Sequence, residues 1–238
     1  MKKYELTNET IEYKGKKLYR IKALIDFGNV EKGARGGFVE KEENLSMSGN
    51  AWVCDNARVC DNARVCDNAR VCGDAQVSGN AWVCDNAQVS GDAWVCDNAR
   101  VCDNAWVCNN ARVCDNARVY GDAFVSDNAQ VSGDAWVCDN ARVCGDANVC
   151  GDAFVSDNAQ VDKSINYAVI KGFGTCYRST TFFRCQDKTV KVSCGCFLGT
   201  IDEFRNQVKN TRGGKIAKEY LMIADLMEIH FSEDGYDD

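Results

Sequence analysis

The sequence predicts an all-β solenoid set between two non-repetitive ends. Valine stands at every sixth position from Val53 to Val161, nineteen times without a miss. Alanine stands at every sixth position from Ala51 to Ala159, also nineteen times. A fixed period marks a stacked repeat architecture, and six residues are too few for a helix pair or a propeller blade. The prediction is therefore a coil of short parallel strands.

Each repeat has the form V-x-(D/G)-(N/D)-A-x. Because Ala and Val lie two positions apart, strand alternation sends both side chains inward and the residues flanking Val outward. The dipeptide between strands is Asp-Asn ten times and Gly-Asp six times. These residues tolerate turns and left-handed backbone, so they form the corners. None is Asp-Asp, which limits repulsion between carboxylates on coils about 4.8 Å apart.

The spacing of Val53 and Ala57, repeated in every later unit, resembles that of the hexapeptide-repeat left-handed β-helix. That family builds a triangular coil from three hexapeptides. The resemblance implies a single-stranded left-handed parallel β-helix of a little over six coils. At the usual strand spacing its length is on the order of 30 Å.

The ends of the chain lack the repeat and are predicted to cap it, because the open strand edges of a solenoid invite stacking between molecules. We expect three parts: a small β N-terminal cap at 1–46, the β-helix at 47–161 and an α+β C-terminal cap at 162–238. Alternation around Gly15 predicts a hairpin. In the C-terminal cap we expect strands over Thr-Thr-Phe-Phe-Arg at 180–184 and at 189–194, a helix capped by Thr200 and a second helix at about 216–230.

The flanks resemble a family of phage and prophage proteins, YdcK-like and often labelled hexapeptide transferases. The similar stretches are Tyr19-Arg-Ile-Lys-Ala-Leu-Ile-Asp-Phe-Gly and Gly36-Gly-Phe-Val-Glu-Lys-Glu-Glu-Asn-Leu-Ser before the repeats, and Ser179-Thr-Thr-Phe-Phe and Cys194-Gly-Cys-Phe-Leu-Gly-Thr after them. The resemblance implies a phage or prophage association. It implies no established activity, since a shared fold does not confer function.

Composition limits the partners of this chain. No stretch approaches the roughly 20 apolar residues that cross a bilayer, and Met1-Lys-Lys is not followed by an apolar run. We therefore expect a cytoplasmic protein that makes no membrane contact. The formal charge of −7 argues against general nucleic-acid binding, which needs clustered Lys and Arg. The repeat carries 17 Asp and 7 Arg between positions 49 and 162, a net of −10, so an acidic rod that mimics nucleic acid is an alternative.

Histidine content argues against catalysis. A hexapeptide-type acyltransferase uses a histidine base, and a carbonic-anhydrase-like metal site uses three histidines. This chain has one histidine, His230, about seventy residues beyond the repeat. No loop interrupts the coils to enclose a substrate. We predict no catalytic residue and no cofactor, and we keep an acyltransferase as the alternative.

Twelve of the sixteen cysteines lie on the repeat. Cys66, Cys84 and Cys102 are predicted to stack on one side, but drift among Cys, Ser and Tyr codons favours small outward residues over metal ligands. We also expect stacked cysteines to lie too far apart for a disulfide. The C-terminal cysteines, Cys176, Cys185, Cys194 and Cys196, lack paired zinc-knuckle spacing and are interpreted as structural. The Asp column at Asp67, Asp85 and Asp103 is interpreted as solvated carboxylates, because the calcium-solenoid spacing is absent. No metal site is predicted.

The outward residues before each valine vary most and include every tryptophan. Grouped by eighteen, one column is richest in Arg and aromatic residues. With Tyr120 beside it, this candidate binding face comprises Arg64, Trp82, Arg100, Arg118, Tyr120, Trp136 and Phe154. The face has two interpretations: a self-stabilising ladder of Arg stacked on Trp, or a contact surface for a protein partner or a second copy of the chain. The function predicted is a non-catalytic scaffold or binding protein.

Overall fold

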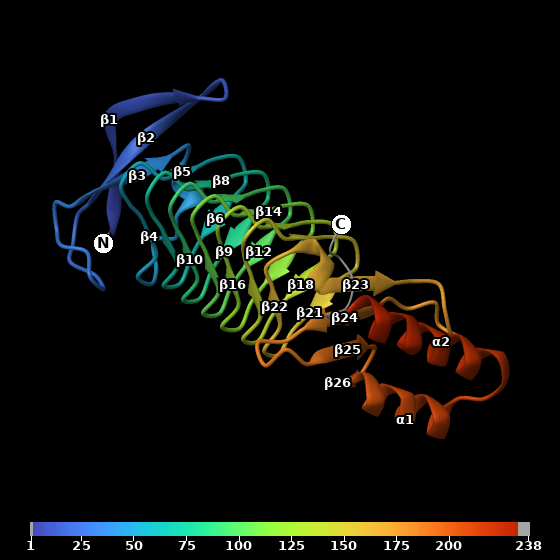
Figure 1. The fold of residues 1–238 in the computed structure, drawn as a ribbon. Helices are drawn as coiled ribbons and strands as arrows, with labels where there is room; N and C mark the ends of the chain where they lie inside the picture. The colour runs from blue at the N-terminus through green and yellow to red at the C-terminus, as the bar shows by residue number, and fades with distance from the viewer. Residues whose placement is uncertain (1, 233–238) are drawn as a thin grey trace.

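The computed structural model describes residues 2–232. The protein is an elongated parallel β-solenoid with the N-terminal hairpin at one end and a small α+β unit at the other (Figure 1). Nineteen two-residue strands follow one another at six-residue intervals along the repeat. Every strand pairs in parallel with the strand eighteen residues away, as Val53 pairs with Val71. The predicted solenoid with a β cap and an α+β cap is confirmed.

The strands of the repeat form three sheets, one for each side of the coil. The first sheet has nine strands, because the N-terminal strands β1 (Tyr4–Tyr13), β2 (Lys16–Ala23) and β3 (Arg35–Val39) extend it through β5 (Arg58–Val59), β8 (Gln76–Val77), β11 (Trp94–Val95), β14 (Arg112–Val113), β17 (Gln130–Val131) and β20 (Asn148–Val149). The second has seven: β4 (Trp52–Val53), β7 (Arg70–Val71), β10 (Gln88–Val89), β13 (Trp106–Val107), β16 (Phe124–Val125), β19 (Arg142–Val143) and β22 (Gln160–Val161). The third has six: β6 (Arg64–Val65), β9 (Trp82–Val83), β12 (Arg100–Val101), β15 (Arg118–Val119), β18 (Trp136–Val137) and β21 (Phe154–Val155).

The repeat valines and alanines fill the interior. All nineteen valines have no exposed surface, and each alanine is at most 1% exposed. The predicted internal column is confirmed, since Val53, Val71, Val89, Val107, Val125 and Val143 are consecutive partners in one sheet. Such burial supplies most of the stability of the coil, because it removes apolar surface from water along its whole length.

The corners adopt the left-handed conformation predicted for them. The first corner residue has a φ between 54° and 70° throughout the repeat, whether it is Asp, Asn or Gly. Apart from Asp157, whose carboxylate accepts from the Lys191 ammonium, each Asp at this position accepts a backbone N–H of the next coil. The carboxylate of Asp55 accepts the backbone N–H of Gly73 in the next coil at 2.9 Å, and that of Asp103 accepts Gly121 N–H at 3.1 Å. These carboxylates are therefore ladder acceptors between coils as well as solvated groups.

The second corner residues form ladders of side-chain amides. Asn50 donates to Asn68 at 2.9 Å, and the same bond repeats upward until Asn104 donates to Asp122 at 3.0 Å. A second ladder ends at Asp134, and a third ends at Asp146. Each ladder thus ends on a carboxylate that accepts the last amide hydrogen.

The N-terminal segment closes the first coil. Strand β3 pairs in parallel with β5, and the 3-10 helix η1 (Glu42–Asn44) follows it. The Lys3 ammonium donates to Ala51 O at 3.0 Å, and the Tyr4 hydroxyl donates to Leu45 O at 2.8 Å. Burial lowers the pKa of Lys3 to about 8. The segment therefore satisfies backbone carbonyls that would otherwise lie open at the edge.

The C-terminal unit closes the last coil. After η2 (Ser164–Asn166) it forms an antiparallel sheet of β23 (Tyr167–Ile170), β24 (Thr180–Arg184), β25 (Val190–Cys194) and β26 (Phe197–Thr200). Helices α1 (Ile201–Thr211) and α2 (Gly214–His230) pack beside this sheet (Figure 1). Thr200 caps α1 as predicted, since its hydroxyl accepts Glu203 N–H at 3.2 Å. The buried Thr181 hydroxyl accepts Phe154 N–H at 2.9 Å and ties the unit to the coil.

Candidate binding face

The candidate face lies on the six-stranded sheet. Its residues before each valine are in register on successive strands, in the order Arg64, Trp82, Arg100, Arg118, Trp136 and Phe154. Tyr120 follows Val119 on β15, so its side chain shares this outward side. The structure therefore brings all seven predicted residues together on one side of the coil.

Trp82 lies between two arginines. The guanidinium of Arg64 is 5.8 Å from the ring centroid of Trp82, and that of Arg100 is 5.5 Å from it on the next coil. Even so, Trp82 remains 40% exposed. Cation–π attraction of this kind is worth about 0.5–1 kcal/mol at an exposed site. The self-stabilising ladder therefore exists, and it still leaves the Trp82 ring open to solvent.

Arg100 and Arg118 are direct neighbours on adjacent strands. Like charges in that position repel each other. Each guanidinium leans towards a different tryptophan, Arg100 towards Trp82 and Arg118 towards Trp136 at 4.7 Å. Neither arginine has an ion-pair partner within residues 2–232. The face thus presents two unneutralised cations between two indole rings.

An aromatic cluster completes the face beyond Arg118. The Tyr120 and Trp136 ring centroids are 5.8 Å apart with an edge-on geometry, and Trp136 and Phe154 are 6.0 Å apart. Burial raises the pKa of the Tyr120 hydroxyl above its usual range, so the group stays neutral at physiological pH.

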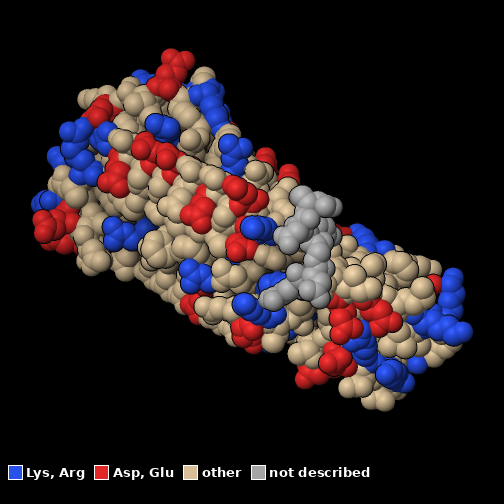
Figure 2. Space-filling view, viewed as in Figure 1, with Lys and Arg blue, Asp and Glu red and all other residues tan. Residues whose placement is uncertain are grey.

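Figure 2 shows how charge is distributed on one side of the molecule: Lys and Arg are interspersed with Asp and Glu and do not form a single basic or acidic field.

A second exposed aromatic group lies on the seven-stranded sheet, outside the candidate face predicted from the sequence. Trp106 is 43% exposed, and its ring meets that of Phe124 edge-on at 5.5 Å. Arg142 stacks on Phe124 at 5.0 Å. With Gln186 from the C-terminal unit they line an open depression of about 750 Å³. The eighteen-residue grouping contains this column too, but the contribution of Gln186 to the depression depends on tertiary structure.

The nine-stranded sheet is partly covered by the N-terminal hairpin. The Lys14 ammonium lies 4.0 Å from the Trp94 ring centroid, and the Tyr13 hydroxyl donates to Gln76. Cys60 is buried beneath the hairpin against Leu18 and Phe38. The first coils of this side are therefore unavailable to a partner, and the other two sheets carry the exposed tryptophans.

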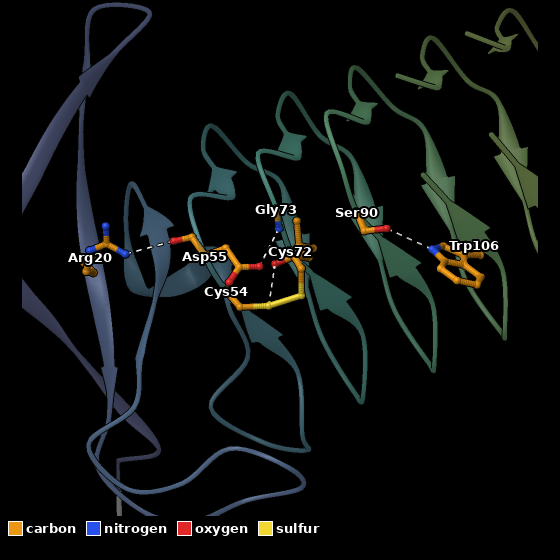
Figure 3. The surroundings of a disulfide bond; sticks show 8 residues. Arg20, Cys54, Asp55, Cys72, Gly73, Ser90 and Trp106 are labelled. Carbon is orange, nitrogen blue, oxygen red and sulfur yellow. Dashed lines mark hydrogen bonds between the residues drawn. A yellow bond between two sulfur atoms is a disulfide. The ribbon is translucent and has the colours of Figure 1, made fainter. Parts of the chain in front are cut away.

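The cysteine columns correct one expectation. Cys54 and Cys72 on the seven-stranded sheet form a disulfide (Figure 3). Their Cα atoms are 4.7 Å apart, because adjacent strands impose that spacing, and disulfides accept about 4.4–6.8 Å. The expectation that in-register strands hold stacked cysteines too far apart is wrong here. A disulfide is more typical of oxidising compartments, so the cytoplasmic location stays a prediction.

The C-terminal unit contains a cavity of about 390 Å³ that the sequence did not reveal. Arg178, Arg212 and Tyr220 line it together with Cys194 and Phe197.

The cap cysteines do not belong to any cluster of potential metal ligands found in residues 2–232. Cys185 is instead buried beside the last coil, where its backbone forms an antiparallel β-bridge with that of Ala159.

His230 lies at the last position of α2 and meets the Phe231 ring edge-on at 4.8 Å. Its buried Nε2 atom has no hydrogen-bond partner among the described residues. A general base needs a substrate proton within reach, and a second group usually orients the ring. No described residue makes a hydrogen bond to Nε2, so no such second group orients the ring through that atom.

The fold and the surface together define a β-solenoid repeat protein. Five segments, which overlap within two separate groups, match the family model described as the YdcK Beta solenoid repeat, at residues 57–73, 63–79, 75–91, 111–127 and 123–139. No curated protein matches the chain. Within residues 2–232, no helix is both long and apolar enough to span a membrane.

Proposed function

We propose that this chain is a non-catalytic scaffold whose six-stranded sheet binds a protein partner through the candidate face. The observation that carries the proposal is the unneutralised pair Arg100 and Arg118 between the rings of Trp82 and Trp136. Tryptophan and arginine dominate the binding energy of interfaces. The partner surface would therefore present carboxylates to the arginines and apolar groups to the indoles. A cytoplasmic location and a phage or prophage association are part of this proposal.

The test replaces Trp82 and Trp136 together by Gln, which the repeat already carries at the same position in Gln76, Gln88, Gln130 and Gln160. Truncating an anchor aromatic typically weakens an interface by about 2 kcal/mol or more. The double variant should keep its fold, with a thermal midpoint within a few degrees of wild type, and lose a captured partner in affinity purification from host lysate.

Two further variants serve as matched controls in this capture experiment. Trp106→Gln removes an equally exposed indole from the seven-stranded sheet and should leave capture unchanged. His230→Ala should also leave capture unchanged, because the proposal assigns no chemistry to that ring. Self-association is read separately by light scattering with both tryptophan variants. Equal capture by wild type and the double variant would reduce the column to a stabilising ladder.

A further inference from the structure

The six-stranded sheet carries a second outward column beside the candidate face. The residues after each valine on β6, β9 and β12 are Cys66, Cys84 and Cys102, and each is followed by an aspartate. All three cysteines are free thiols and partly exposed. Because the strands are in register, the three sulfur atoms are stacked along the coil axis on adjacent strands.

The thiols and carboxylates of this column meet in two overlapping clusters. In one, the ligand atoms of Cys66, Asp67 and Cys84 all lie within 4.8 Å of one another. In the other, those of Cys84, Asp85 and Cys102 do so. Cys84 belongs to both clusters, and its thiol donates to the Asp85 carboxylate at 3.3 Å. The arrangement therefore offers two thiolates and one carboxylate at each of two adjacent positions.

We propose that this column, Cys66, Cys84 and Cys102 with Asp67 and Asp85, binds Zn²⁺, with the Cys84 thiolate shared between two ions. A zinc ion holds sulfur at about 2.3 Å, so two tetrahedral sulfur ligands are about 3.8 Å apart. The ligand atoms of each cluster lie within 4.8 Å of one another, so they would have to approach by at most about 1 Å to reach this spacing. The carboxylates favour zinc over Cu(I), which prefers sulfur ligands alone.

Neighbouring charge supports the site. Arg64 stands two residues before Cys66 on the same outward side, so its cation offsets part of the negative charge of a thiolate and carboxylate set.

The chain provides a matched control. Cys96 and Cys114 are stacked on the nine-stranded sheet at the equivalent position, but they form no such cluster with a carboxylate within the described residues. Serine is native at this position in Ser78, Ser90, Ser126, Ser132 and Ser156, so a Cys→Ser change keeps the coil. Asp85→Asn recreates the Asn-Asn corner that already exists at Asn109, where φ is 59°.

The experiment uses the full chain with Cys54→Ser and Cys72→Ser as background, reduced with a phosphine under anaerobic conditions. Zn²⁺ is titrated against a chromophoric chelator, and Cd²⁺ reports thiolate binding through its charge-transfer absorption. Cys84→Ser should lose the tightly held zinc, and Cys66→Ser and Cys102→Ser should each lose part of it. Loss of an outer-shell group alone costs about 10–100-fold in metal affinity, so loss of the shared thiolate should cost at least as much. Cys114→Ser should bind like the background.

Asp85→Asn tests the carboxylate and should weaken Zn²⁺ binding without changing binding of Cu(I). Equal zinc affinity in Cys84→Ser and Cys114→Ser would overturn the proposal. So would a background protein that holds Cu(I) but releases all Zn²⁺ to the chelator. Since these readouts use only metal and protein, their result is independent of the partner proposed for the Arg and Trp residues.

Discussion

The repeat and the C-terminal unit bury their apolar residues in different ways. In the repeat each buried valine packs on an identical valine one coil away, as Val107 does on Val89 and Val125. In the C-terminal unit the core joins residues from different elements, such as Phe182 of the sheet with Phe204 of α1 at 6.1 Å and Phe204 with Tyr220 of α2 at 5.7 Å. A one-dimensional stack depends on each neighbour in turn, whereas a small globular core depends on many different contacts together.

The largest expected effect comes from placing a charge inside each region. Val107→Asp should disrupt folding of the solenoid, because an unpaired buried carboxylate costs several kcal/mol. Val192→Asp, at an equally buried valine of β25, should remove the helical circular-dichroism signal and leave the β signal of the coils. Gln88→Asp, at an exposed outward position, is the control and should be nearly neutral. If Val192→Asp also abolished the β signal, the two regions would be one cooperative unit.

An intermediate effect is expected at the corners. Asp103 has a φ of +58°, and its carboxylate accepts Gly121 N–H. Asp103→Gly and Asp103→Val both lose that hydrogen bond. Only valine has a Cβ atom that clashes in the left-handed backbone conformation, which costs about 1–2 kcal/mol of folding free energy. The free energy of unfolding from denaturant melts should therefore be higher for Asp103→Gly than for Asp103→Val by about 1–2 kcal/mol, with a correspondingly higher midpoint. Equal midpoints would show that the corner can change its backbone, contrary to the regular φ values along the repeat.

The smallest expected effect is a response to alkaline pH. Burial, followed by hydrogen bonding to the next aspartate, raises the pKa of Cys66 and Cys96 from the ordinary value of 9.0 to about 12. The unfolded thiols ionise first, so the stability they contribute is full below pH 9 and is lost as pH rises from 9 towards 12. The thermal midpoint of the reduced protein should fall over this window. The double change to Ser should lessen the slope, and Cys176→Ser, at an exposed position of the cap, should not.

Much of the fold follows from the sequence alone, because the same six-residue pattern of buried and exposed positions occurs nineteen times in succession. The inward valine and alanine, the left-handed corners and the eighteen-residue strand register all come from the six-residue pattern. The Thr200 cap was also predictable, since a threonine before two acids is a local signal. Local signals of this kind need no knowledge of distant contacts.

The tertiary structure decided which outward residues are free. Trp52 and Trp82 occupy the same repeat position, yet Trp52 is only 3% exposed because Tyr4 and Phe27 pack on its ring. Trp94 is covered by Lys14 from the hairpin. The pattern also could not show that Cys84 joins two clusters with carboxylates while Cys114 joins none. The sequence by itself determined the coil and its periodic columns. The caps and the side-chain geometry determined which columns present a surface, because those contacts join residues that the period does not relate.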